Sequence, residues 1–209
     1  MKKLISGVGM VAGLLFMLAM FGSYFAVEYG VFEEEPVGIA ELRAQKESGA
    51  EPEWLPGQVA WLRLDGTHIN YPVMQASDNV WYLSHDYYGN NVASGAVFLD
   101  FRNASNFSDR LAIIYGHRMN GDLMFSDVAK YRDASYFAEH LTGSLELPGR
   151  TLALRVLAYR EVDAGDGLYR NLVLPGYSER LLVLSTCDRN NRAHRDILVL
   201  AFDNRGELW

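Results

Sequence analysis

The feature that most constrains the fold is a series of short segments with the composition of β-strands, running from residue 59 to residue 202. They are rich in β-branched, aromatic and other apolar residues, and turn signals such as Asp65-Gly66 and Pro148-Gly149 separate them. The segments cover residues 59–64, 69–73, 95–100, 111–115, 144–147, 151–159, 181–186 and 197–202. Strands this short and this numerous favour a closed or nearly closed β-barrel. We therefore predict a mainly β fold, an eight-stranded closed barrel with short helices between the strands.

The segments between the strands predict brief helices and one longer loop. Asp78 is suited to cap a helical turn at its N-terminus, because its carboxylate can accept hydrogen bonds from the first free N–H groups. Residues 161–178 are expected to form a loop, since they contain Gly165, Gly167, Pro175 and Gly176. The helices are expected at residues 39–46, 78–83 and 124–131.

The N-terminal segment predicts a membrane anchor. Lys2 and Lys3 precede an uncharged run over residues 4–27, long enough to cross a hydrocarbon core of about 30 Å as a helix. The lysines before the run, and acidic residues after it, favour a cytoplasmic N-terminus and an exported remainder. The alternative is a cleaved secretory signal, but the run is long for one and no clean Ala-x-Ala site follows. We predict a single-pass membrane protein.

Three parts of the chain follow from this organisation. Residues 1–30 are expected to form the cytoplasmic tip and the transmembrane anchor, and residues 31–57 an extracytoplasmic linker with a short helix. Residues 58–209 are expected to form the globular β-barrel domain. Pro52 and Pro56 break the chain just before that domain begins.

Charge and motif content narrow the classes of function. The net charge is −7, and the sequence contains no run of Lys and Arg residues. Because binding to nucleic acid needs a basic surface, we expect no nucleic-acid partner. Glycine-rich phosphate loops are absent from the sequence. His, Cys and carboxylate residues do not recur at metal-ligand spacing. We therefore expect no cofactor and no metal.

A candidate nucleophile stands at the end of an apolar strand. Cys187 is the single cysteine of the chain, so in an exported protein it has no internal disulfide partner. It follows the strand over residues 181–186, where a rigid ladder can hold a reactive group at the loop side. The alternative is a buried, inert thiol, which is common for a free cysteine.

Two further residues supply the chemistry that a thiol nucleophile needs. His117 ends the strand over residues 111–115, and an imidazole can take a thiol proton and return one to a departing amine. Arg195 opens the last strand and carries a permanent charge that can stabilise an oxyanion. If the Cys187 and Arg195 strands are neighbours, the two side chains share one rim of the barrel.

Each of these residues also has an ordinary structural interpretation. His117 could be a hydrogen-bonded structural histidine, and Arg195 could be a surface charge, as most arginines are. Four other histidines compete with His117 for the catalytic role, and His194 is the strongest of them because it neighbours Arg195 in the sequence. The other three competitors are His68, His85 and His140.

At these residues the sequence resembles the sortases, and specifically their class B. The resemblance spans nearly all of residues 58–202, and so many ordered matches make chance a poor explanation. The matching segments are 61–67 (WLRLDGT), 69–75 (INYPVMQ), 78–79 (DN), 82–83 (YL), 85–86 (HD), 88–89 (YG), 95–103 (GAVFLDFRN), 114–117 (IYGH), 124–125 (MF) and 184–187 (LSTC), with Arg195 at the family's spacing.

The resemblance implies a sortase β-barrel and a two-step acyl transfer by a cysteine transpeptidase. Cys187 is expected to cleave a C-terminal sorting motif after its Thr and to hold the product as a thioester, with His117 and Arg195 in the roles given above. An amine of a peptidoglycan cross-bridge or a pilin lysine then releases it. The partners implied are secreted proteins that bear sorting signals, at the membrane of a Gram-positive type bacterium. The residues that correspond to the motif groove are Asn79, Leu83, Tyr115 and Ser185.

One segment departs from the class B pattern. Class B members usually carry a long helix in the connection that precedes the cysteine strand, whereas residues 160–180 of this chain are predicted to be a loop. Two alternative functions therefore stay open at this point. One is another cell-wall cysteine peptidase or transpeptidase, and the other is an anchored binding or assembly module with an inert thiol.

Overall fold

The computed structural model describes residues 36, 38–48, 54–187 and 193–208, with the backbone alone for residues 187 and 204–208. Residues 1–35 lie outside the described residues, which belong to one compact unit. The predicted anchor over residues 4–27 therefore also lies outside them. Within the described part of the chain, none of the helices combines the length and the apolar character needed to span a bilayer.

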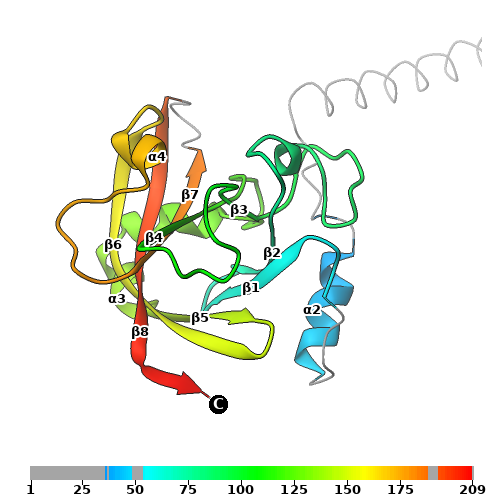
Figure 1. The fold of residues 1–209 in the computed structure, drawn as a ribbon, viewed down its shortest axis with the longest axis horizontal. Helices are drawn as coiled ribbons and strands as arrows, with labels where there is room; N and C mark the ends of the chain where they lie inside the picture. The colour runs from blue at the N-terminus through cyan, green and yellow to red at the C-terminus, as the bar shows by residue number, and fades with distance from the viewer. Residues whose placement is uncertain (1–35, 37, 49–53, 188–192, 209) are drawn as a thin grey trace, which may run out of the picture. The chain divides into compact units, whose positions relative to one another are not determined.

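The described residues form eight strands that close into a barrel, as the spacing of the apolar segments predicts (Figure 1). Around the barrel the strands follow the order β1-β2-β3-β4-β7-β8-β6-β5. The pairs β2–β3 and β4–β7 are parallel, and the other pairs are antiparallel. The strand bounds are β1 Gln58–Leu64, β2 Asn70–Met74, β3 Phe98–Leu99, β4 Leu111–Tyr115, β5 Thr142–Leu147, β6 Arg150–Asp163, β7 Leu181–Cys187 and β8 His194–Leu208.

The helices of the described residues are short. They are α2 Ile39–Glu47, η1 Trp81–Leu83, η2 Ser126–Arg132, α3 Ala134–Glu139 and α4 Gly167–Asn171. The prediction of a helical turn after Asp78 is confirmed, since its Oδ1 accepts hydrogen bonds from the N–H groups of Val80 and Trp81. The prediction of a loop over residues 161–178 is wrong in part, because α4 lies within it.

Strands β4, β7 and β8 are buried on both faces, which explains their continuous apolar sequences. Because successive side chains point to opposite faces of a sheet, each strand contributes to two clusters. The side chains inside the barrel include Ala112, Ile114, Leu182, Leu184, Leu198 and Leu200. Those on the outer face include Leu111, Ile113, Leu181, Val183, Ile197 and Val199. The β6–β7 connection covers this outer face with Leu168 and Leu172, among others.

Strand β3 is shorter than the apolar segment that predicted it. The segment over residues 95–100 is buried, but only Phe98 and Leu99 join the ladder. Its first residues bond to the loop of η1 instead, where the Ala96 N–H donates to the Tyr82 carbonyl at 3.0 Å. Gly95 has a φ of +57°, and a Cβ there would lie 2.4 Å from that same carbonyl oxygen. The segment resembled a longer strand because it is apolar and buried beyond the two residues that pair.

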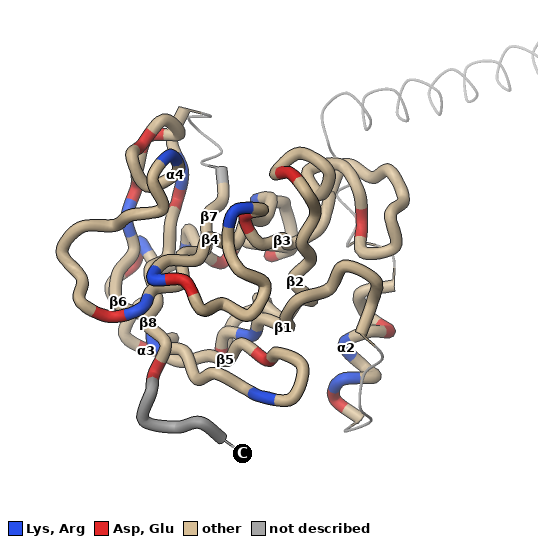
Figure 2. Tube along the Cα trace, viewed as in Figure 1, with Lys and Arg blue, Asp and Glu red and all other residues tan. Residues whose placement is uncertain are grey.

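The helix α2 packs against the barrel although it is largely polar. Its Ile39 and Leu42 are buried in the main core, and Arg43 Nε donates a hydrogen bond to the Asn70 carbonyl at 2.8 Å. Basic and acidic residues are interspersed over many elements of the described chain (Figure 2). Lys46 of α2, for example, forms an ion pair with Glu146 of β5.

Candidate active site

Strand pairing brings three predicted site segments to one rim of the barrel. The parallel pair β4–β7 aligns Tyr115 with Ser185, and the Gly116 N–H donates to the Ser185 carbonyl at 3.2 Å. The antiparallel pair β7–β8 places Cys187 opposite Arg195 in the register. His117 therefore lies just after the end of β4, Cys187 at the end of β7 and Arg195 at the start of β8. The Cys187 side chain lies outside the described part of the structure.

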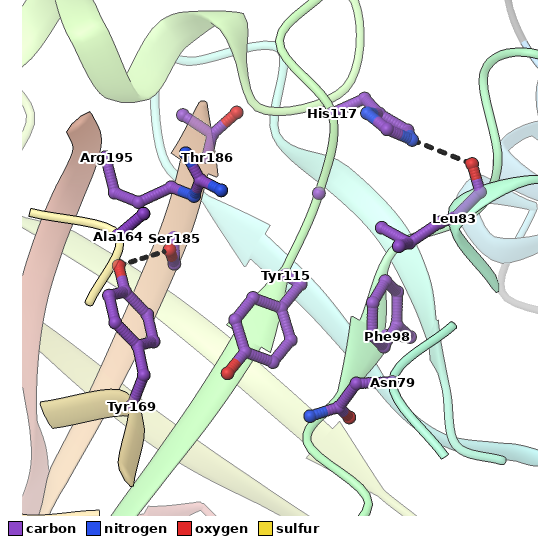
Figure 3. A pocket seen from close by; sticks show the side chains of 11 residues that line it. Asn79, Leu83, Phe98, Tyr115, His117, Ala164, Tyr169, Ser185, Thr186 and Arg195 are labelled. Atoms are coloured by element: carbon purple, nitrogen blue, oxygen red, sulfur yellow. Dashed lines mark hydrogen bonds between the residues drawn. The ribbon is translucent and has the colours of Figure 1, made fainter. Parts of the chain in front are cut away.

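A pocket of about 290 Å³ lies at this rim. It brings together His117, Arg195 and all four residues that the resemblance assigns to the motif groove (Figure 3). The lining consists of Asn79, Leu83, Phe98, Tyr115, Gly116, His117, Ala164, Tyr169, Ser185, Thr186 and Arg195. The lining thus combines aromatic and aliphatic side chains with a few polar groups, an arrangement typical of a ligand-binding pocket.

The His117 imidazole is fixed by a backbone carbonyl. Its Nε2 lies 2.8 Å from the Leu83 oxygen, and the ring points toward Leu83 (Figure 3). Since a carbonyl only accepts hydrogen bonds, Nε2 carries a proton in this arrangement. The ring is therefore set up as a proton donor on the η1 side of the pocket.

The four competing histidines lie elsewhere, and none of them lines the pocket. His68 bonds to Asp127, with Nδ1 3.1 Å from Oδ2. His194, the strongest competitor, pairs with Asp163 at 3.2 Å. The other two stack on aromatic rings, His85 on Trp81 and His140 on Tyr136. The geometry therefore favours His117 among the histidines of the chain.

Gly116 is needed at its position because the Phe125 ring lies against it. A Cβ on residue 116 would come within 2.7 Å of that ring, closer than real Cβ contacts allow. Phe125 is fully buried, and its N–H donates to the His117 carbonyl at 2.9 Å. The buried ring thus supports the segment that carries the imidazole from beneath.

We expect Gly116→Ala to lower the free energy of unfolding by about 1–3 kcal/mol, because the added methyl group overpacks this contact. Chemical denaturation of the full chain measures the effect. Gly165→Ala is the matched control, since a Cβ at Gly165 meets nothing within 4 Å. Equal stabilities for the two variants would contradict the overpacking explanation.

A buried carboxylate joins the His117 segment to the Arg195 strand. Asp196 is fully buried, and Arg118 Nη1 donates to its Oδ2 at 2.8 Å. Arg118 follows His117 and Asp196 follows Arg195, so this ion pair connects the neighbours of two candidate catalytic residues. The Tyr159 hydroxyl also donates to Asp196, and Arg132 Nη2 lies 3.5 Å from it. Removal of the charge would leave Arg118 without its carboxylate partner at this point.

We expect Asp196→Asn to lower the free energy of unfolding by about 2 kcal/mol, because the ion pair with Arg118 is lost and one of the two accepting oxygens becomes an NH2 group that cannot accept. The measurement is a denaturation curve of the full chain. Asp65→Asn provides the comparison, since its side chain is half exposed and its charge is solvated. A loss no greater than that of the control would show that the Asp196 charge is not needed.

Asp100 lies under the pocket and bonds to two of its lining residues. Its Oδ2 accepts from the Tyr115 hydroxyl and from Asn79 Nδ2, both at 2.9 Å. Burial alone would raise the pKa of Asp100, but hydrogen bonds from Arg102, Tyr115 and Asn79 outweigh it and hold the pKa below its usual range. Burial, reinforced by the nearby Asp100 charge, raises the pKa of Tyr115 well above that of a free phenol. The network therefore consists of a carboxylate and a neutral hydroxyl donor.

Folding also gathers three potential metal ligands, His68, Asp122 and Asp127, with ligand atoms within 4.8 Å of one another. Lys130 Nζ lies between the two carboxylates, 2.8 Å from an oxygen of each. Burial lowers the pKa of Lys130, but its bonds to Asp122 and Asp127 more than compensate and raise it. The ammonium group thus already offsets one of the two negative charges of this cluster.

The sequence did not single out several residues of the site. Tyr169 belongs to the segment predicted as a loop, and its hydroxyl lies 2.9 Å from Ser185 Oγ across the pocket. Phe98, Ala164 and Thr186 also line the pocket, and Asp100 supports it from beneath. The matching segments 95–103 and 184–187 contain Phe98, Asp100 and Thr186 but assign them no role, and Asp100 also directly ends an apolar segment.

Comparison with known proteins places this geometry in a family. No protein-family model matches the chain. Sortase B of Listeria monocytogenes is 29% identical over 165 residues, which cover 68% of this chain and 67% of that protein. The structure of Clostridium perfringens sortase B has a TM-score of 0.62 at 24% identity, over 70% of this chain and 93% of that one, and this likeness concerns the fold.

A further solved structure is close enough to decide the family. A Streptococcus pyogenes class B sortase involved in pilus biogenesis is 31% identical, with a TM-score of 0.60. The match covers 68% of this chain and 89% of that one. Family membership also decides between the alternatives left open by the sequence, in favour of an enzyme of this class over an inert binding module. The chain belongs to the class B sortases and is a cysteine transpeptidase.

Proposed function

We propose that this sortase cleaves a C-terminal sorting motif of secreted proteins and joins the new carboxyl end to an amine of peptidoglycan or of a pilin. Cys187 is the nucleophile, His117 transfers protons and Arg195 stabilises the oxyanion. The observation that carries the proposal is the register of β7 and β8, which pairs Cys187 with Arg195 beside a pocket that His117 also lines. A thiolate, an acid and a fixed cation are what acyl transfer from a peptide bond requires.

In the first step the Cys187 thiolate attacks the carbonyl carbon of the scissile peptide bond. The carbon–sulfur bond forms, and the Arg195 guanidinium donates hydrogen bonds to the oxyanion that develops. The carbon–nitrogen bond then breaks, and the imidazolium of His117 gives its proton to the departing amine. The products are a thioester on Cys187 and the released C-terminal fragment. For this transfer the His117 ring exchanges the Leu83 carbonyl for the substrate nitrogen.

In the second step an acceptor amine attacks the thioester carbonyl. A carbon–nitrogen bond forms, the carbon–sulfur bond breaks and the electron pair returns to the sulfur as thiolate. The neutral imidazole of His117 takes the proton that the attacking nitrogen loses. The enzyme is thereby restored with both groups in their starting charge states, and the product is an amide between the substrate protein and the acceptor.

The pocket is proposed to hold the residues of the motif that precede the scissile bond. Its volume of about 290 Å³ is small and suits one or two side chains. Leu83 and Tyr115 provide apolar surface, while Asn79 and Ser185 provide polar groups. We further propose that residues 4–27 anchor the enzyme in the membrane, with the catalytic domain outside the cell, because Lys2 and Lys3 precede this uncharged run.

A transfer assay with the full-length chain in detergent micelles tests the proposal. The substrates are a panel of fluorescence-quenched peptides that share a Thr before the scissile bond and differ in the residues before it. The acceptors are hydroxylamine, triglycine and an Nα-acetylated lysine amide, each added separately. We expect cleavage of a subset of the peptides and, by mass spectrometry, products joined to the acceptor nitrogen.

Two results would contradict the proposed function. One is a folded enzyme that cleaves none of the peptides, which would remove the sorting motif as the substrate class. The other is cleavage that gives free carboxylic acid alone at every acceptor concentration, which would make the enzyme a hydrolase.

A further inference from the structure

We infer that Arg102 is a positioning residue that fixes α4 as one wall of the pocket and thereby sets the affinity for the substrate peptide. The inference rests on the proposed function for its kinetic part, and on the geometry alone for its structural part. Arg102 does not line the pocket. It lies between β3 and β4, and it acts through the backbone of α4 in the β6–β7 connection.

The contacts of Arg102 with α4 are direct. Its Nη2 donates to the Tyr169 carbonyl at 2.6 Å, and its Nη1 donates to the Arg170 carbonyl at 3.1 Å. Both carbonyls belong to the last turn of α4. The carbonyl groups of a helix's last turn have no N–H partner within the helix. A cation near this end also complements the helix dipole. The guanidinium therefore caps the C-terminal end of α4 from a distant part of the chain.

A helix as short as α4 depends on such outside contacts. Its five residues, Gly167–Asn171, are far fewer than the ~12–15 that an isolated helix needs to be even marginally stable. Asp166 caps its N-terminus by accepting from the Leu168 N–H at 2.7 Å. Leu168 is buried against the outer face of the barrel. Arg102 supplies a further attachment, at the end of α4 that carries Tyr169.

Asp100 holds the guanidinium in the orientation that this contact requires. Arg102 Nε donates to Oδ1 at 2.9 Å and Nη2 donates to Oδ2 at 2.8 Å, which is a bidentate pair. The carboxylate is fully buried, and it bonds to Tyr115 and Asn79 of the pocket as well. One hydrogen-bond network thus connects three parts of the pocket lining: Tyr115 of β4, Asn79 before η1, and Tyr169 of α4. A lysine could not reproduce it, because an ammonium lacks the planar fork.

The attachment of α4 determines where Tyr169 lies. Its hydroxyl reaches Ser185 Oγ at 2.9 Å, and its ring lies 6.3 Å from that of Tyr115, at an interplanar angle of 28° (Figure 3). Tyr169 thus closes the side of the pocket beside β7. Loss of the Arg102 contact would let this wall move without a change in the strands that carry Cys187 and Arg195. Substrate affinity is therefore expected to fall while the chemistry of the bound substrate is retained.

Hydrogen–deuterium exchange and steady-state kinetics of Arg102→Met test both parts. We expect the amides of residues 166–172 to exchange about tenfold faster, a change of about 1.4 kcal/mol in local opening, while those of β7 are unchanged. With the best peptide of the panel, KM is expected to rise about tenfold and kcat to stay within about twofold. Arg102→Lys should give a smaller change of the same kind.

Two further variants distinguish the effect of the Arg102–α4 contact from general effects of a substitution on the stability of the β6–β7 connection. Arg110→Met is the matched control, since Arg110 Nη2 donates to the Tyr177 carbonyl at 3.1 Å in the same β6–β7 connection but outside α4. It should leave exchange at residues 166–172 and KM unchanged. Tyr169→Phe removes the hydroxyl but not the Arg102 contacts. It should raise KM while exchange in α4 stays as in the wild type.

The outcomes are distinct. Unchanged exchange in α4 of Arg102→Met, or faster exchange throughout the barrel, would contradict the proposal that Arg102 fixes α4. Faster exchange confined to α4 with an unchanged KM would overturn its role in affinity. If the wild-type enzyme turns over none of the peptides, the proposed function fails, and the exchange data alone then decide whether Arg102 fixes α4.

Discussion

Substitution of Cys187 by Ala is expected to abolish thioester formation and to lower turnover of a sorting peptide by about 10⁴-fold or more, because the nucleophile is lost. The measurement is the cleavage rate of the quenched peptide, together with mass spectrometry of the intact enzyme for the acyl adduct. Since Cys187 is the single cysteine of the sequence, thiol labelling of the wild-type chain reports on this residue alone. A reactive thiolate should label rapidly in the folded protein, whereas an inert buried thiol should label on unfolding.

Cys187→Ser is the companion to this variant. It keeps nearly the same shape but exchanges the thiol for a hydroxyl that the same site does not activate, so it should be almost as inactive as the alanine variant. Both variants should unfold at the same denaturant concentration as the wild type, which excludes misfolding as the cause. An undiminished rate in Cys187→Ala would remove the covalent mechanism.

Arg195→Ala is expected to lower kcat/KM by about 10²–10³-fold, because the transition state loses a charged hydrogen-bond donor to the oxyanion. Its backbone is paired with Val162 of β6 and with Cys187 of β7, so the fold should tolerate the truncation. Arg195→Lys keeps the charge without the planar fork and should lie between the alanine variant and the wild type. Steady-state kinetics with the same quenched peptide measure the series.

The control for Arg195 is Arg63→Ala on β1, whose side chain is 61% exposed and pairs with Asp65 at 3.4 Å. Its kcat/KM should stay within about twofold of the wild type, because a solvated surface pair contributes little. If Arg195→Ala were as active as this control, the guanidinium would have no part in the reaction, and the oxyanion would need another donor.

The rim of the barrel was predictable from the sequence because its strands are buried on both faces. Residues 181–184 and 197–202 are continuously apolar for that reason, and so the ends of these strands could be located closely. The short spacing between Cys187 and Arg195 then suggested neighbouring strands, and the β7–β8 register confirms this. The eight-stranded closed barrel is likewise confirmed. The catalytic roles of these residues stay predictions until the variants above are measured.

The parts that escaped prediction depend on contacts between distant segments. The helix α4 has few residues, and Arg102, which bonds to its last turn, lies 67 residues before Tyr169 in the chain. The glycines of the local sequence therefore favoured a loop at this position. The partner of His117 is a backbone carbonyl at Leu83, and a carbonyl is present at every residue. In both contacts the acceptor is a backbone carbonyl, so the residue type of the partner does not indicate the contact.

The place of β8 in the barrel bears on when the site comes into existence. Of the eight strands of the barrel this one is synthesised last, yet it lies between β6 and β7. It pairs with β6 from residue 194 to residue 208 and with β7 over residues 195–201. A growing chain that has been made only as far as residue 187 holds a thiol but has no strand to complete the sheet beside it. Pairings between distant segments form late and slowly. If Arg195 lowers the pKa of this thiol as proposed, the thiol should have the reactivity of an ordinary free cysteine until β8 has been added to the sheet.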